Sequence, residues 1–140
     1  DLAAREFGTV FLDLPGSWTN WSMSLVGRSD AIILVVEMTV ASLRQARRQL
    51  SLLADQGLQA VPTIIVANRV QKKLFRTIDL VDAERALGHP VRYSVANDFP
   101  LVSTALDQGI VIGQIKANSK VSKNIVAILD GCDEIMNRLD

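Results

Sequence analysis

Short apolar runs alternate along the chain with longer stretches in which apolar residues recur at helical spacing. An unbroken apolar run of strand length is typical of a parallel strand that is covered on both faces. Such runs predict buried strands at 7–12, 31–36 and 63–67, and a more alternating strand at 91–95. Helical spacing and end signals predict a short helix after Gly16, and others near 39–56, 78–87, 98–109 and 119–139.

Strands that alternate with helices favour βαβ units and a parallel sheet. The sequence shows no internal repeat and no long linker. We therefore predict one α/β domain with three layers, in which helices flank a mostly parallel sheet.

The predicted helices differ in the faces that they offer. Residues 39–56 carry an apolar stripe for the core, and three arginines lie largely off it: Arg44, Arg47 and Arg48. A solvated face is one interpretation of these arginines, and a surface for an acidic partner is the other. Residues 119–139 predict a docking face formed by Val121, Ile125, Ile128, Cys132, Ile135 and Leu139. In the helix after Gly16, Trp18, Trp21 and Leu25 share one side, which indicates either core packing or an anchor at an interface.

Composition excludes several classes of function. The 15 basic and 15 acidic residues give zero net charge, which argues against a dedicated nucleic-acid surface. His89 is the only histidine and Cys132 the only cysteine, so a histidine-based zinc site, a Ser-His-Asp triad and an intrachain disulfide are not expected. No apolar run reaches the roughly 18 residues of a membrane span.

Polar residues follow three of the predicted strands, namely Asp13, then Asn68 with Arg69, then Asn97 with Asp98. Ligands of open α/β sheets bind beyond the carboxyl ends of the strands. A carboxylate there can hold magnesium or its waters, so Asp13 is a candidate catalytic and metal residue, with a turn or helix cap as the alternative. The amide of Asn68 can read a purine edge.

The phosphate loop of nucleotide-binding proteins, Gly-x-x-x-x-Gly-Lys-Ser/Thr, is absent from the sequence. Without backbone amides and a lysine around the phosphates, we expect this chain alone to bind ATP poorly and to hydrolyse none. Asp13 and Gly16 also match the Asp-x-x-Gly of GTPases, but Asn68-Arg-Val-Gln71 lacks the aspartate that pairs with guanine, which favours adenine.

Together these motifs resemble the ParA/MinD family of deviant-Walker ATPases. The resemblance rests on Asp13-Leu-Pro-Gly16, on residues 29–44 and on Val66-Ala-Asn-Arg-Val70, and it covers almost the whole chain. Ser17-Trp-Thr-Asn-Trp21 and Ala86-Leu-Gly-His-Pro90 look most like the CpaE/TadZ pilus-assembly branch.

The resemblance implies that residues 1–140 are the carboxyl-terminal part of such an ATPase domain, because the family's phosphate loop precedes its Walker B strand. Asp13 would be the Walker B acid, acting on Mg²⁺ through water. Asn68 and Arg69 would lie on the adenine of ATP, and Asn97 and Asp98 in the loop that closes over it.

The resemblance also implies a cytoplasmic protein, at the cell pole or peripheral to the inner membrane, that localises pilus or secretion machinery through an ATP-dependent homodimer. Expected partners are pilus and secretion assembly proteins; nucleic acid and direct membrane insertion are not expected. A non-catalytic scaffold of the same fold and a ParA-like DNA-segregation ATPase are the alternatives.

The family's phosphate-loop strand lies between the 7–12 and 31–36 strands. Without it, we predict that the 7–12 strand either pairs directly with 31–36 or stays detached and promotes self-association.

Overall fold

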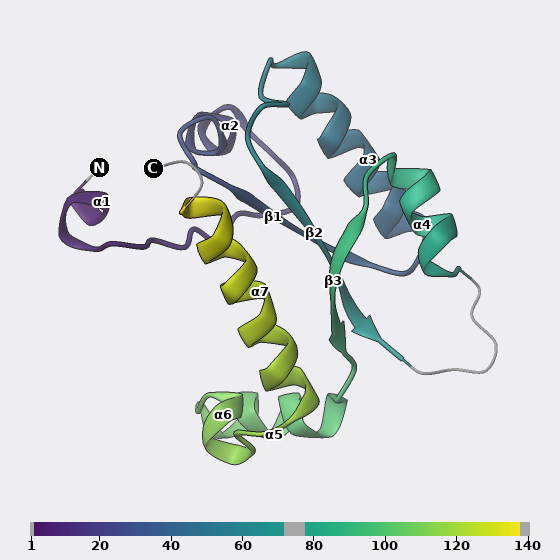
Figure 1. The fold of residues 1–140 in the computed structure, drawn as a ribbon. Helices are drawn as coiled ribbons and strands as arrows, with labels where there is room; N and C mark the ends of the chain where they lie inside the picture. The colour runs from purple at the N-terminus through teal and green to yellow at the C-terminus, as the bar shows by residue number, and fades with distance from the viewer. Residues whose placement is uncertain (1, 72–77, 138–140) are drawn as a thin grey trace.

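The structure, a computed structural model, describes residues 2–71 and 78–137. Three parallel strands form its sheet in the order β1-β2-β3: β1 (Ile32–Glu37), β2 (Thr63–Val70) and β3 (Val91–Ala96). The described part also contains seven helices, namely α1 (Leu2–Glu6), α2 (Asn20–Val26), α3 (Val40–Asp55), α4 (Leu80–Leu87), α5 (Phe99–Gln108), α6 (Ile112–Ile115) and α7 (Lys120–Met136). Helices α3 and α4 cover one face of the sheet, and α7 crosses the other (Figure 1). The predicted three-layer α/β fold is confirmed.

The main core lies between the sheet and α3. Alternate residues of β1 are buried there: Ile32, Leu34 and Val36. The predicted stripe of α3 meets them, since Leu43, Ala46, Leu50 and Leu53 are all buried. Thr39 begins α3 by accepting a hydrogen bond at its side chain from Ser42 N. Because the stripe has helical spacing and the strand alternates, burial of both fixes how α3 packs on β1.

The predicted strand at 7–12 is wrong. Residues 7–19 are irregular, and no strand of the described sheet pairs with them. Phe7 and Phe11 are 65% and 62% exposed. Direct pairing with β1 is therefore also wrong, and the segment is detached, which was the other expected arrangement. A strand needs a neighbour for its backbone hydrogen bonds, and apolar composition alone supplies none.

Element ends agree with the prediction to within a few residues, with one informative exception at β2. That strand continues three residues past the predicted end at Ala67, to Val70. Helix α5 begins after Asp98 and α7 after Ser119, and each of these side chains accepts a capping hydrogen bond from a backbone N–H of its helix. Two features of the sequence lie outside the described residues: the small basic loop that Lys72, Lys73 and Arg76 indicate before the 78–87 helix, and Leu139 of the last helix.

The docking face of α7 is only partly as predicted. Val121 is buried and Ile128 half-buried, but Ile125 is 41% exposed, and Val126 and Leu129 beside it are exposed too. The reason is that α7 packs mainly on β3, so it does not cover the β1 side of the same face. In keeping with this, Val35 of β1 is 57% exposed. Among residues 2–71 and 78–137, no helix has both the length and the apolar composition to cross a membrane.

The two tryptophans near α2 have different environments. Trp18 packs against the main core, as the core interpretation predicted. Trp21 is 56% exposed, so the core interpretation is wrong for it. The interpretation of Trp21 as an anchor at an interface stays a prediction.

Candidate functional site

The candidate site is the edge of the sheet where the parallel strands end. Glu37 closes β1 and lies opposite Asn68 of β2 in the register. Arg69 follows Asn68, and Val70 pairs with Ala96 at the end of β3. Asn97 continues from there and donates from its backbone N–H to Val70 O at 3.0 Å. The topology thus gathers Asn68, Arg69, Asn97 and Asp98 at one edge, as the sequence predicted.

Arg69 has an unusual backbone conformation. Its φ is +54°, and it is the only non-glycine residue with positive φ in the described part of the chain. The register between β2 and β3 shifts between Ala67 and Val70, so the conformation marks an irregularity in the ladder. A left-handed non-glycine residue costs about 1–2 kcal/mol, and such strain clusters at functional sites.

Two interactions hold this conformation. The backbone N–H of Arg69 donates to Oδ1 of Asn68 at 2.9 Å. The guanidinium donates from Nη1 to Oε1 of Glu37 at 3.0 Å, with the two side chains 70% and 45% exposed. An ion pair this exposed contributes little stability, about 0–1 kcal/mol. Its main consequence is therefore geometric, because it directs the Arg69 side chain across the ends of β1 and β2.

The loop after β3 is built by capping. Asp98 accepts a hydrogen bond from Leu101 N at 3.3 Å and so begins α5, whose first residues include Pro100. Asn124 of α7 accepts from Ala96 N at 3.1 Å and fixes the end of β3. Asn97 lies between these two fixed points and is exposed. The loop therefore presents the Asn97 amide to solvent while the Asp98 carboxylate is used in the cap.

Asp13 does not end a strand, because the strand predicted before it is absent. It is exposed, and no hydrogen bond or ion pair of its carboxylate occurs within residues 2–71 and 78–137. The turn after it is tied to α3, where Gln49 and Gln45 donate from Nε2 to Gly16 O at 2.8 and 3.2 Å. Within the described residues, no three side chains of His, Cys, Asp or Glu gather as a metal site. A magnesium ion at Asp13 would need its other ligands from phosphates and water.

The chemistry of the edge suits a nucleobase better than a phosphate. Asn68 uses its amide oxygen for the Arg69 N–H, which leaves its amide N–H groups available as donors. Asn97 adds a second exposed amide, and the Arg69 guanidinium is a planar cation that stacks on aromatic rings. Groups of these kinds can hydrogen-bond to a nucleobase and stack on it, and the sequence contains no phosphate loop to hold phosphates.

Sequence reasoning missed two residues of this site. Glu37 directly follows the predicted 31–36 strand, but nothing in the sequence indicates its pairing with Arg69. Its signal was an acid directly after a buried apolar strand, the same signal that singled out Asp13. Asn124 was overlooked because a polar residue inside an apolar helix stripe gives no indication of its partner until the helix is docked.

Comparison with solved structures shows which fold this is. A ParA family ATPase from Chlorobium tepidum TLS is similar over 78% of this chain and 44% of its own, with a TM-score of 0.70 and 21% identity. The cell division ATPase MinD of Pyrococcus furiosus matches over 91% and 51%, with a TM-score of 0.68 and 22% identity. MinD in the MinC:MinD cell division complex of Aquifex aeolicus matches over 79% and 45%, with a TM-score of 0.65 and 18% identity.

The chain therefore has the α/β fold of ParA- and MinD-type ATPases, and it spans about half the length of these structures. No protein-family model matches the sequence, and no curated protein matches it. At 18–22% identity the likeness establishes the fold.

Proposed function

We propose that residues 1–140 form the carboxyl-terminal part of the ATPase domain of a ParA/MinD-like protein, and that they supply the adenine side of its ATP site. The observation that carries the proposal is the edge at which Asn68, Arg69, Asn97 and Asp98 gather in a fold shared with ParA and MinD ATPases. Asn68 and Asn97 would read the base, and Arg69 would lie against it. Asp13 would act on Mg²⁺ through water.

The finer assignment is to the CpaE/TadZ branch, which localises pilus and secretion machinery. It is supported by Ser17-Trp-Thr-Asn-Trp21 and Ala86-Leu-Gly-His-Pro90. In this proposal the protein is cytoplasmic, at the cell pole or peripheral to the inner membrane, and it works as an ATP-dependent homodimer that holds pilus or secretion assembly proteins. That a solved neighbour is a complex of MinD with MinC supports partner binding as a mode of action for this fold.

A non-catalytic scaffold of the same fold is the second candidate. The two candidates differ in the segment that would precede these residues in such a domain: an intact phosphate loop there favours the ATPase, and a degraded one favours the scaffold. In this alternative the edge residues shape a surface for partners and bind no nucleotide. A ParA-like role in DNA segregation is disfavoured, because a chain with zero net charge has no electrostatic excess for phosphate backbones.

The test is a comparison of two ligands in the protein expressed from its complete reading frame. We expect Asn68→Ala to weaken ATP by about 1–3 kcal/mol, roughly 5- to 150-fold, and to leave pyrophosphate unchanged, because only the base loses its partner. Asn20→Ala, at an exposed amide on α2, is the matched control. Titration calorimetry reports both affinities.

Equal losses for ATP and pyrophosphate would make Asn68 a structural residue. Absence of ATP binding by the unsubstituted protein would favour the scaffold. For Asp13→Asn we expect ATP affinity to lose its dependence on Mg²⁺, whereas an unchanged dependence would contradict the assignment of Asp13.

A further inference from the structure

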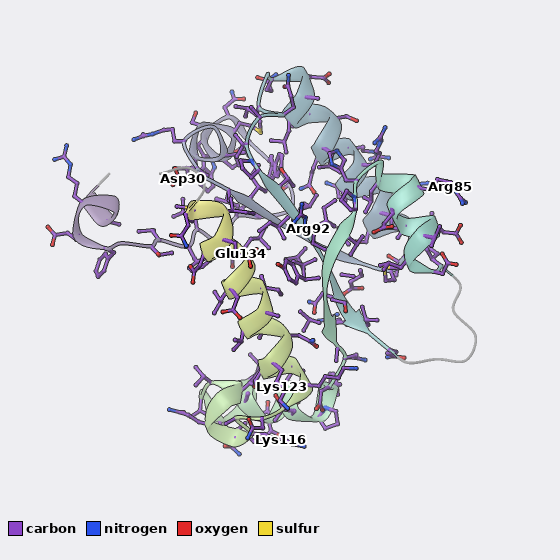
Figure 2. All side chains as sticks on the ribbon, viewed as in Figure 1. Asp30, Arg85, Arg92, Lys116, Lys123 and Glu134 are labelled. Atoms are coloured by element: carbon purple, nitrogen blue, oxygen red, sulfur yellow. The ribbon has the colours of Figure 1, made fainter. Side chains whose placement is uncertain are left out.

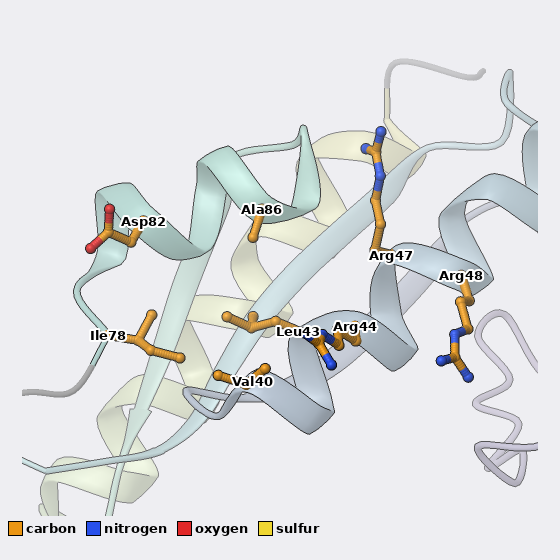
Figure 3. Close-up of a pocket in the computed structure, with 8 residues that line it drawn as sticks. All are labelled: Val40, Leu43, Arg44, Arg47, Arg48, Ile78, Asp82 and Ala86. Atoms are coloured by element: carbon orange, nitrogen blue, oxygen red, sulfur yellow. The ribbon is translucent and has the colours of Figure 1, made fainter.

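A groove with mixed chemistry lies between α3 and α4, on the outer surface of the helix layer (Figure 3). Its volume is about 350 Å³. The floor is aliphatic: the side chains of Val40, Leu43 and Ile78 gather between the two helices, and Ala86 points toward them. None of these residues belongs to the sheet edge described above, so the groove is a separate feature.

The walls of the groove are strongly basic. Arg44, Arg47 and Arg48 line it from α3, against a single acidic residue, Asp82 of α4. Asp82 already pairs with Arg85 at 3.0 Å, so its charge is balanced within its own helix. The three arginines therefore give the groove a local positive charge in a chain whose net charge is zero.

The arginines are not equivalent. Arg47 donates from Nη1 to Leu87 O and so caps the carboxyl end of α4. Its guanidinium therefore has a structural role in joining α3 to α4. Arg44 and Arg48 are exposed, and within residues 2–71 and 78–137 neither has a hydrogen bond or ion pair at its guanidinium. Two guanidiniums without partners beside an aliphatic floor are suited to carboxylates, which arginine binds through two parallel hydrogen bonds.

The shape and lining select among possible occupants. Val40 is 53% exposed, and the groove is open along both helices, so it does not enclose a small ligand as small-molecule pockets do. Among the described residues that line it none is aromatic, so single-stranded nucleic acid would find no stacking platform in this part of the groove. Its apolar residues form a hollow, whereas a membrane-binding surface needs apolar residues that project into the bilayer.

We propose that the groove between α3 and α4 is a docking site for an acidic amphipathic segment of a partner protein. An aliphatic side chain of that segment occupies the floor over Val40, Leu43 and Ile78, and flanking carboxylates pair with Arg44 and Arg48. This is the helix-in-groove mode of peptide recognition, with charge setting the specificity.

The experiment selects short random peptides by phage display on the protein and measures the affinity of the enriched peptides by fluorescence anisotropy. We expect them to carry Asp or Glu beside a large aliphatic residue. R44E/R48E should weaken them by at least about tenfold, because two ion pairs are lost and repulsion replaces them. The matched control is K116E/K123E, which changes net charge equally at exposed lysines on the far side of the molecule (Figure 2). It should leave binding unchanged.

A second variant tests the floor without changing charge. Ala86 is exposed on α4, and Ala86→Leu fills the groove while it keeps a strong helix former in place. We expect the same peptides to lose binding and the thermal midpoint to stay unchanged. The proposal is overturned if no enriched peptide depends on Arg44 and Arg48, if K116E/K123E weakens binding equally, or if A86L has no effect. It is also overturned if oligo-dT or anionic lipid vesicles bind through the same two arginines in preference to the peptides.

Discussion

Helix α7 packs on β3 through a contact that leaves no room for a side chain, and this gives a sharp test of the structure. Gly131 is buried on α7 and faces Tyr93 of β3. A Cβ at position 131 would lie 1.9 Å from Oη and 2.7 Å from Cζ of Tyr93. Both distances are far inside van der Waals contact, so Gly131→Ala requires either the ring to turn away or α7 to move.

Two opposing terms set the expected size of this effect. Alanine is favoured over glycine inside a helix by about 1 kcal/mol. Overpacking a tight contact costs about 1–3 kcal/mol. We expect a net loss of about 0–2 kcal/mol of unfolding free energy, which corresponds to a fall of at most roughly 8 °C in thermal midpoint for a domain of this size.

The assay is chemical denaturation followed by circular dichroism, with a second background that removes the ring. In a Tyr93→Leu background the Cβ meets no ring, so Gly131→Ala should become stabilising by about 1 kcal/mol. The coupling between the two positions should then equal the overpacking term, about 1–3 kcal/mol. If Gly131→Ala stabilises both backgrounds equally, α7 does not lie on Tyr93 as the structure has it.

Three further outcomes are expected. The 140-residue chain alone should not bind a fluorescent ATP analogue with magnesium at micromolar concentration, because it has no phosphate loop; saturable micromolar binding would contradict this. Burial and the neighbouring Asp133 raise the pKa of the Cys132 thiol above its ordinary 9.0, so the folded state holds the proton longer than the unfolded state. The contribution of this thiol to the unfolding free energy is therefore constant below its ordinary pKa, and it falls as the pH rises from the ordinary to the raised pKa. Cys132→Ala should remove this fall from the unfolding free energy measured by denaturation across that pH range. Finally, the chain should self-associate in sedimentation, and Val35→Lys, on the exposed face of the edge strand β1, should shift it toward monomer; a monomeric unsubstituted chain would refute the role of this edge.

The elements that the sequence predicted correctly are those whose information is local. The stripe from Leu43 to Leu53 specifies both the helix and its buried face. Its apolar residues recur every three or four positions, so the helical period can be read from this short segment alone. Caps work in the same way: Thr39 and Asp98 each accept a hydrogen bond from the backbone N–H three residues on, so one residue indicates where a helix begins.

The candidate site was predictable as a location and not as a set of contacts. Parallel strands place their carboxyl ends at one edge, so Asn68 and Asn97 had to lie near each other once the strands were identified. The positive φ of Arg69 and its pairing with Glu37 depend on a register shift between β2 and β3. Such a shift depends on how two strands that are distant in the sequence pair with each other. No glycine near Arg69 indicates a residue with positive φ there.

The failed strand at 7–12 shows what an apolar run does and does not encode. Its apolar composition indicates that the segment is more stable when it is buried, because burying each Val, Leu or Phe side chain stabilises the protein by roughly 1.5–3 kcal/mol relative to exposing it to water. It does not supply the neighbouring strand that would satisfy its backbone. In the structure the segment is exposed, and so are Val35 on the edge strand and Ile125 on α7. Three elements from different parts of the chain therefore each present apolar surface that a neighbouring polypeptide would bury. Single exposed apolar residues are ordinary on proteins, whereas a continuous exposed apolar stretch marks an interface. The exposed run at 7–12 is such a stretch, so it is the element from which we expect the self-association that sedimentation can measure.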